Sequence, residues 1–257
     1  MAALVAGVLA VLGPDVLGAH AQSPAEPAPR VLVFSRTTGF RHASIPSGVA
    51  AIRAVGTRGG FAVDATEDPA QFTGENLARY RAVIWLNTSG EVLDEAQRAA
   101  FEHYVGSGGG YVGVHAAAAT EPGWRWYGTL LGGARLRGHP APQRATILVD
   151  DPSHPSTSSL PRRWRRLDEW YAFRRNPRRR AHVLATLSEA SYRPGAAAMA
   201  RDHPIAWCSA VGAGRAWYTA GGHTTASYRE PRFRRHLLGG ILSAAGLAPN
   251  GRCAAPG

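Results

Sequence analysis

The chain has 257 residues, 45% of them hydrophobic, which is enough for one large α/β domain with a full core. All 29 basic residues are arginine, and the formal net charge is +11. The lack of lysine excludes a Schiff-base lysine, a P-loop lysine and a lysine general base, and arginine is a poor proton shuttle because it stays protonated.

The first 21 residues are typical of a secretory signal peptide, although no arginine precedes the apolar run. Residues 2–13 are small and apolar, and Ala19-His20-Ala21 fits the small-x-small cleavage pattern. A run of about a dozen residues is too short to span a bilayer. We expect cleavage after Ala21 and a secreted or extracytoplasmic protein without a membrane span. The expected parts are a signal peptide over 1–21, a linker over 22–29, a domain over 30–247 and a tail over 248–257.

Strands and helices alternate in the first half of the domain. Strands with continuous apolar residues are predicted at 30–35, 61–63, 80–86 and 111–114. Between them, helices are predicted from Pro46 to Gly59-Gly60 and over 93–105. This order predicts βαβ units and a parallel sheet.

The second half is less regular. Strands are predicted at 145–149, 182–186, 205–207 and 215–219, and a last helix runs from Pro231 to a cap at Gly246. The pattern contains no repeat and no clear domain boundary, and it predicts no particular oligomeric state.

Two cysteines, Cys208 and Cys253, form an even pair in a chain expected to be exported. This favours a disulfide between a core strand and the C-terminal tail. The alternative is a buried Cys208 with Cys253 in a frayed tail.

Two arginine clusters stand out. The first surrounds Trp164 and consists of Arg162, Arg163, Arg165 and Arg166. The second surrounds Pro177 and consists of Arg174, Arg175, Arg178, Arg179 and Arg180. Such runs can hold nucleic acid or an anionic surface, but a solvated face is the simpler interpretation. No nucleic-acid partner is expected.

Several polar residues follow predicted strands. His42, Asn87, His115 and His223 each come shortly after a strand, and the carboxyl ends of parallel strands form one functional edge. Residues 113–117 resemble a nucleophile elbow with His115 where serine or cysteine would stand. Both cysteines lie far downstream, which excludes cysteine-dependent amidotransfer.

The histidines allow a metal interpretation. His42, His115, His139 and His223, with Glu169 as a carboxylate, are candidate ligands for a divalent ion such as Zn²⁺. They lack a short local spacing, so the prediction depends on the fold. The alternative is that each histidine hydrogen-bonds a loop or the core, as expected for His103, His154, His203 and His236.

Seven motifs in chain order resemble the ThuA-like (trehalose-utilisation) family. They are Phe40-Arg41-His42-x-Ser44-Ile45, Gly113–Ala117, Leu131-Gly132-Gly133 with Gly138-His139-Pro140, His154–Thr157, Asp168-Glu169-Trp170-Tyr171, His203–Trp207, and Tyr218-Thr219-x-Gly221-Gly222-His223-Thr224. The resemblance implies an α/β fold of the class I glutamine amidotransferase type, three-layered, with a mostly parallel, flavodoxin-like sheet and helices on both faces. It also implies a role in the metabolism of trehalose or 3-keto-sugars.

The resulting hypothesis is an exported enzyme of hydrolase or lyase type that acts on a disaccharide or keto-sugar. His115, His223 and Glu169 are the candidate catalytic residues. If the segment is extended, neighbouring residues face opposite sides, so only one of Asp168 and Glu169 can point into the site. The family resemblance favours Glu169. Candidate sugar contacts are Arg41, Asn87, Trp126, Tyr171 and Thr224. The alternatives are a non-catalytic carbohydrate-binding module and an arginine-driven binder of an anionic polymer.

Overall fold

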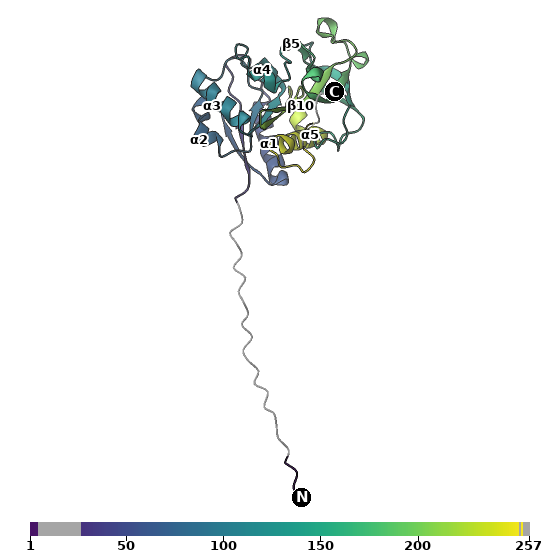
Figure 1. Ribbon diagram of the computed structural model, residues 1–257. Coiled ribbons are helices and arrows are strands. Elements are labelled where there is room, and N and C mark those ends of the chain that lie inside the picture. The colour runs from purple at the N-terminus through teal and green to yellow at the C-terminus, as the bar shows by residue number, and fades with distance from the viewer. Residues whose placement is uncertain (5–26, 252, 254–257) are drawn as a thin grey trace.

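The computed structural model describes residues 1–4, 27–251 and 253 (Figure 1). The predicted cleavage site after Ala21 lies outside these residues. Among the described parts of the chain, no helix combines the length and the apolar character needed to cross a membrane.

A nine-stranded mixed sheet forms the centre, in the order β2-β1-β3-β4-β11-β10-β9-β6-β7. The first five strands in that order run parallel: β2 (Ala62–Thr66), β1 (Arg30–Phe34), β3 (Ala82–Leu86), β4 (Gly110–Val114) and β11 (Gly214–Thr219). The remaining pairs are antiparallel, through β10 (Pro204–Val211), β9 (His182–Ser188), β6 (Gln143–Val149) and β7 (Arg163–Asp168). The predicted α/β fold is confirmed; the antiparallel extension, which ends at β7, was not predicted.

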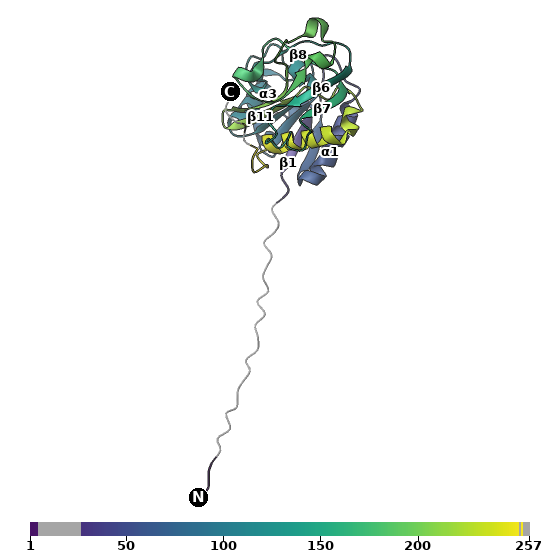
Figure 2. The ribbon, with the colours of Figure 1, turned by 90° about the vertical axis from the view of Figure 1, so that its right-hand side faces the viewer.

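Helices cover both faces of the sheet, and neighbouring residues of β3 show which helix lies where. The Trp85 ring packs on Phe101 of α3 (Glu95–Gly106), with centroids 5.2 Å apart. Leu86 points the other way, close to Gly48 of α1 (Ile45–Gly59). On that face α1 lies beside α5 (Pro231–Ala244), as Figure 2 shows.

Shorter elements complete the fold. They are α2 (Gly74–Leu77), α4 (Tyr127–Leu130), the small sheet of β5 (Leu136–Gly138) with β8 (Ala172–Phe173), and the 3₁₀ turns η1 (Pro69–Gln71), η2 (His115–Ala119), η3 (Pro177–Arg179), η4 (Glu189–Ser191), η5 (Gly195–Ala197) and η6 (Ser227–Arg229). The α3 helix begins at Glu95, slightly later than predicted, because Asp94 and Gln97 form a capping box that fixes its first turn.

The first arginine cluster is a strand rather than a uniformly solvated face. Residues of β7 alternate between exposed and buried, so Arg163 and Arg165 face solvent while Trp164 and Arg166 face inward. Arg166 is 4% exposed and forms ion pairs with Asp168 at 3.1 Å and Glu230 at 3.0 Å. The sequence did not reveal this alternation of exposed and buried residues, because arginine occupies both exposed and buried positions of the strand.

The Cys208–Cys253 disulfide is present. It joins β10 to the C-terminal segment across 45 residues. The predicted pairing is therefore confirmed, and Cys253 is held against the sheet.

Candidate active site at the carboxyl edge of the sheet

Four side chains from separate parts of the chain converge at one edge of the sheet. His42 follows β1, His115 follows β4, Glu169 follows β7 and His223 follows β11, and their potential ligand atoms all lie within 4.8 Å of one another. Glu169 Oε2 lies 3.3 Å from His115 Nε2 and 3.2 Å from His223 Nδ1. These distances make the group one cluster rather than separate histidines.

His115 is held in an unusual backbone conformation directly after β4. Its φ of 49° lies in the left-handed region, which costs free energy for a residue with a Cβ and concentrates at functional sites. The ring is fully buried, and Nδ1 lies 2.7 Å from the carbonyl oxygen of Ala220. A carbonyl can only accept, so Nδ1–H donates, and Nε2 is the ring nitrogen directed at the cluster.

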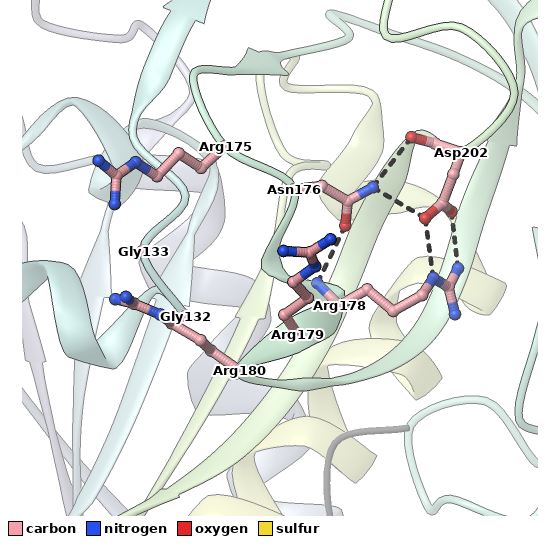
Figure 3. A pocket seen from close by; sticks show the side chains of 8 residues that line it. All are labelled: Gly132, Gly133, Arg175, Asn176, Arg178, Arg179, Arg180 and Asp202. Carbon is pink, nitrogen blue, oxygen red and sulfur yellow. Dashed lines mark hydrogen bonds and ion pairs between the residues drawn. The ribbon is translucent and has the colours of Figure 1, made fainter.

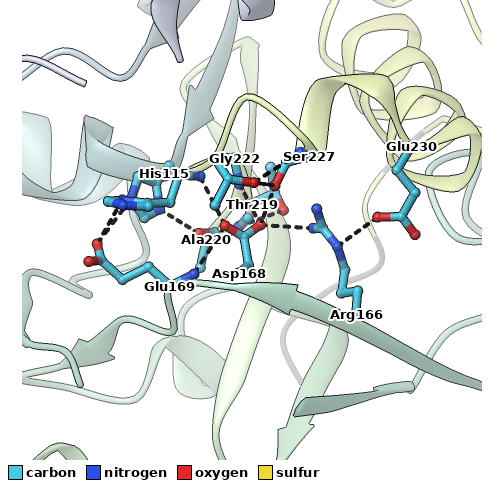
Figure 4. A network of polar contacts seen from close by, with 12 residues as sticks. His115, Arg166, Asp168, Glu169, Thr219, Ala220, Gly222, Ser227 and Glu230 are labelled. Carbon is cyan, nitrogen blue, oxygen red and sulfur yellow. Dashed lines mark hydrogen bonds and ion pairs between the residues drawn. The ribbon is translucent and has the colours of Figure 1, made fainter. Parts of the chain in front are cut away.

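Asp168, next to Glu169, holds the loop that carries His223 (Figure 4). Its carboxylate accepts the backbone N–H of Gly222 at 2.9 Å and that of His223 at 3.0 Å, and it also accepts the Ser227 hydroxyl at 3.1 Å. Gly222 has a φ of 116°, and a Cβ there would lie 2.7 Å from the Tyr228 hydroxyl oxygen. The loop therefore requires glycine beside His223.

The charges of the cluster influence one another strongly. Burial raises the pKa of Glu169, but contact with His115 and His223 outweighs it and holds this pKa well below its usual range. Hydrogen bonding to Glu169 raises the pKa of His223. Burial, together with the neighbouring His115 and His223, lowers the pKa of His42 to about 3, so its ring is neutral at physiological pH.

A cavity of about 410 Å³ opens onto the cluster, within the range of about 300–1,000 Å³ typical of small-molecule sites. Two aromatic rings form part of its wall: Phe40, which is 69% exposed, and Tyr171, which is buried beside His115 with ring centroids 4.2 Å apart. The lining residues are Gly39, Phe40, His42, Ser89, Gly90, Ala116, Ala119, Leu136, His139, Glu169, Tyr171 and His223.

His139 lies at the rim of this cavity, as expected from the sequence. Its Nδ1 is 3.1 Å from Glu169 Oε1, the oxygen that does not face His115 and His223. Its side chain is 39% exposed. His139 is therefore a neighbour of the four-residue cluster that reaches solvent, rather than a member of it.

Four of the predicted sugar-contacting residues are not among those that line this cavity. Arg41 points away from it and pairs with Glu67 at 2.7 Å. Trp126 stacks on Trp124, with ring centroids 5.1 Å apart.

The other two hold loops in place. The Asn87 amide donates to Ser44 Oγ at 3.0 Å and to the Gly222 carbonyl at 3.2 Å. Thr224 Oγ1 lies 2.9 Å from Ser227 Oγ. Both residues thus hydrogen-bond within the segment around His223. Of the predicted sugar contacts, only Tyr171 is among the described residues that line the cavity.

Sequence reasoning missed Phe40, although a signal was present. In an extended segment, alternate residues face the same side. Phe40 and His42 both line the cavity and their ring centroids lie 4.8 Å apart, whereas Arg41 between them pairs with Glu67. The alternation could have replaced Arg41 by Phe40 as a candidate contact.

A larger cavity of about 620 Å³ lies at the second arginine cluster (Figure 3). It is lined by Gly132, Gly133, Arg175, Asn176, Arg178, Arg179, Arg180 and Asp202. Arg178 is neutralised by Asp202 at 2.7 Å and by Asp150 at 3.1 Å. Arginine does not exchange protons at physiological pH, and the one carboxylate among the described lining residues, Asp202, is paired with Arg178, so this cavity offers no counterpart of the histidine cluster.

Comparison with protein families gives one match over most of the chain. A family model named ThuA and described as trehalose utilisation matches residues 30–244. Comparison with curated proteins gives no match.

Solved structures share the fold. A ThuA-like protein from Bacteroides uniformis is 27% identical, with a TM-score of 0.73 over 88% of this chain and 96% of that one. A ThuA-like protein from Parabacteroides merdae is 18% identical, with a TM-score of 0.70 over 89% and 98%. A β-galactosidase from Bacillus circulans is 14% identical, with a TM-score of 0.56 over 86% of this chain but 32% of that one, a likeness of fold alone.

Proposed function

The chain belongs to the ThuA family, and from this premise we propose that it binds a disaccharide or keto-sugar in the 410 Å³ cavity and transforms it at the histidine–glutamate cluster. The family description, trehalose utilisation, supports a role in carbohydrate metabolism. The observation that carries the proposal is that His223 and Glu169, which contact buried His115, line a cavity with aromatic walls.

The walls suit a sugar because sugars carry both apolar ring faces and hydroxyl groups. Phe40 and Tyr171 offer aromatic surface, while His139 and Glu169 offer hydrogen-bonding groups on the same cavity. Binding sites for small molecules commonly combine an apolar lining with a few convergent polar groups.

The reaction type follows from the number of carboxylates. Among the described residues that line the cavity, Glu169 is the sole carboxylate. Most glycosidases that act on unmodified sugars need two carboxylates, one on each side of the glycosidic bond. A single carboxylate among histidines favours proton abstraction next to a carbonyl, as in the lyase-type cleavage of a keto-sugar.

In that cleavage, a base takes the proton from the carbon beside the keto group and the electron pair forms a carbon–carbon double bond. The bond to the glycosidic oxygen then breaks, and an acid protonates that oxygen. The products are an unsaturated keto-sugar and an alcohol, so atoms and electrons balance without an oxidant. Imidazoles suit such proton transfers at physiological pH.

The test compares trehalose and its 3-keto derivative as ligands and as substrates of the full chain. Calorimetry measures binding, and mass spectrometry of the reaction mixture detects the unsaturated product. We expect the keto-sugar to be turned over and Glu169→Gln to bind it with turnover reduced at least about a hundredfold. Binding without turnover would instead support the carbohydrate-binding module, and absence of both would refute the proposal.

Export is a further part of the proposed function. The apolar run over 2–13 and the Ala19-His20-Ala21 pattern favour a cleaved signal peptide. The Cys208–Cys253 disulfide supports this, because disulfides persist mainly in oxidising compartments.

A further inference from the structure

We propose that His115, His223 and Glu169, with His42 beside them, bind one divalent transition-metal ion of the Zn²⁺ type. This inference rests on the proposed function only in that the ion would face the sugar cavity. Its evidence is the geometry of the donor atoms, and its test measures metal rather than sugar.

The three closest donor atoms form a nearly equilateral triangle. His115 Nε2 and Glu169 Oε2 lie 3.3 Å apart, His223 Nδ1 and Glu169 Oε2 lie 3.2 Å apart, and the two ring nitrogens lie 3.3 Å apart. With bonds of about 2.0–2.1 Å to the metal, two ligands of a tetrahedral zinc ion lie about 3.3–3.4 Å apart. Neighbouring ligands of an octahedral ion with similar bonds lie closer, at about 3.0 Å. The triangle therefore matches one face of a tetrahedron.

The hydrogen bonds around His115 prepare it to bind a cation. Because Nδ1–H donates to the Ala220 carbonyl, Nε2 is the ring nitrogen that faces the carboxylate oxygen of Glu169. The two potential donor atoms lie where the side chains of His115 and Glu169 are 0% and 7% exposed, so they are shielded from water. A carbonyl that fixes the outer nitrogen is the usual partner of a metal-binding histidine.

His42 supplies a fourth potential donor. Its ring lies almost equally far from the rings of His115 and His223, at 4.9 and 5.0 Å. The residue is 5% exposed, and its Nδ1 is buried without a hydrogen-bond partner among the described residues. An unsatisfied polar atom in such a place costs free energy unless something outside the chain satisfies it.

The donor types select the class of metal. Imidazole nitrogens with one carboxylate suit Zn²⁺ and similar ions, whereas Ca²⁺ and Mg²⁺ prefer all-oxygen sites. A second close group, His154 with Cys208 and Cys253, lacks thiolates because its cysteines form the disulfide. Since His42, Glu169 and His223 line the cavity, an ion held there could polarise a sugar carbonyl, and His139 remains beside Glu169 to exchange protons.

The experiment uses the full chain without a histidine tag, stripped with a chelator and then equilibrated with Zn²⁺ or Co²⁺ alone. Mass spectrometry of the elements gives the ions bound per chain, and the visible absorption of Co²⁺ reports its coordination. We expect about one ion per chain, tetrahedral Co²⁺ absorption and a higher Tm with Zn²⁺. His115→Ala and Glu169→Gln should each weaken binding at least about tenfold. His103→Ala, which removes an exposed histidine of α3, should bind as the native chain does.

The rival occupant of the triangle is a proton shared by the histidines and Glu169. In that case, the stripped protein would take up no Zn²⁺ saturably, or the variants of His115 and Glu169 would bind as well as the control. Either result overturns the inference. Glu169→Gln keeps the size of the side chain, so the comparison stands even if His115→Ala does not fold.

The two proposals fail separately. Turnover of the keto-sugar by a protein that takes up no metal would leave the proposed function intact and overturn the metal site. Metal uptake without sugar binding would do the reverse.

Discussion

The Asp168 carboxylate accepts the backbone N–H of His223 at 3.0 Å. The next residue, Glu169, contacts the imidazole of the same His223 at 3.2 Å. Two consecutive acidic residues therefore hold one histidine, the first by its backbone and the second by its ring. This division of roles places the two carboxylates at the end of β7 on different atoms of the same residue.

Removing the charge of Asp168 should loosen that loop and destabilise the protein. In Asp168→Asn, buried Arg166 loses its partner at 3.1 Å and the Gly222 and His223 amides lose a charged acceptor. Breaking a buried pair costs about 3–5 kcal/mol, which urea unfolding would measure. Asp64→Asn is the control, since its partly exposed pair with Arg30 is screened by solvent and should matter much less. Equal losses in the two variants would contradict this role of Asp168.

Phe40 should contribute to sugar binding without contributing to stability. Its ring is 69% exposed at the cavity, so Phe40→Ala should leave the Tm nearly unchanged. Loss of one aromatic contact should weaken binding of the keto-sugar about two- to tenfold, as measured by calorimetry. Leu167→Ala is a matched control, because Leu167 is also exposed but lies on β7 outside the cavity lining. An unchanged affinity in Phe40→Ala would remove Phe40 from the site.

The disulfide should stabilise the fold through the chain that it closes. Cys208 and Cys253 are 45 residues apart, and loop-closure entropy for that length corresponds to about 4 kcal/mol as an upper guide. Reduced protein and Cys253→Ser should therefore unfold at clearly lower urea concentrations than oxidised protein, and to a similar extent. A reductant should have no effect on the stability of Cys253→Ser. If it destabilises that variant as well, reduction acts elsewhere.

His236 should make the protein less stable as the pH falls. Burial lowers its pKa to about 3, while Nδ1–H donates to the Ser156 carbonyl and Nε2 accepts from Thr219. In the unfolded chain its pKa is about 6.5, so between about pH 6.5 and pH 3 the unfolded state binds a proton that the folded state does not.

The free energy of unfolding should thus decrease by up to about 1.4 kcal/mol per pH unit within this window from His236 alone. His236→Gln should be less stable at neutral pH but should show a shallower slope. Buried His154, whose pKa is lowered to about 4, gives a slope of the same sign in both proteins. Parallel pH profiles for the two proteins would contradict the assignment to His236.

Exported protein should begin at Gln22, because Ala19-His20-Ala21 presents small residues at the two positions that a signal peptidase reads. N-terminal sequencing of protein from the extracytoplasmic fraction checks this. A mature chain that retains residues 2–13 would argue against cleavage. Ala21→Arg is the matched variant, and it should accumulate uncleaved.

The sequence alone determined the elements whose residues show a simple pattern. Continuous apolar runs predicted β1, β3 and β4 within about two residues of their actual bounds, because strands buried on both faces require apolar side chains throughout. The carboxyl ends of parallel strands lie at one edge of a sheet, which predicted that the residues after β1, β4 and β11 share that edge. His42, His115 and His223 lie there within reach of one another.

Only the tertiary structure decided which neighbours face the cavity. Arg41, Asn87, Trp126 and Thr224 stand beside cavity or loop residues in the sequence, yet they turn to Glu67, Gly222, Trp124 and Ser227. Side-chain direction depends on partners that are distant in the chain, and a local pattern does not contain them. β7 was missed for a related reason: Arg166 is buried because Asp168 and Glu230 neutralise it, and Glu230 lies 64 residues away. A charged residue becomes an inward-facing strand residue only when the fold brings its counter-ions to it.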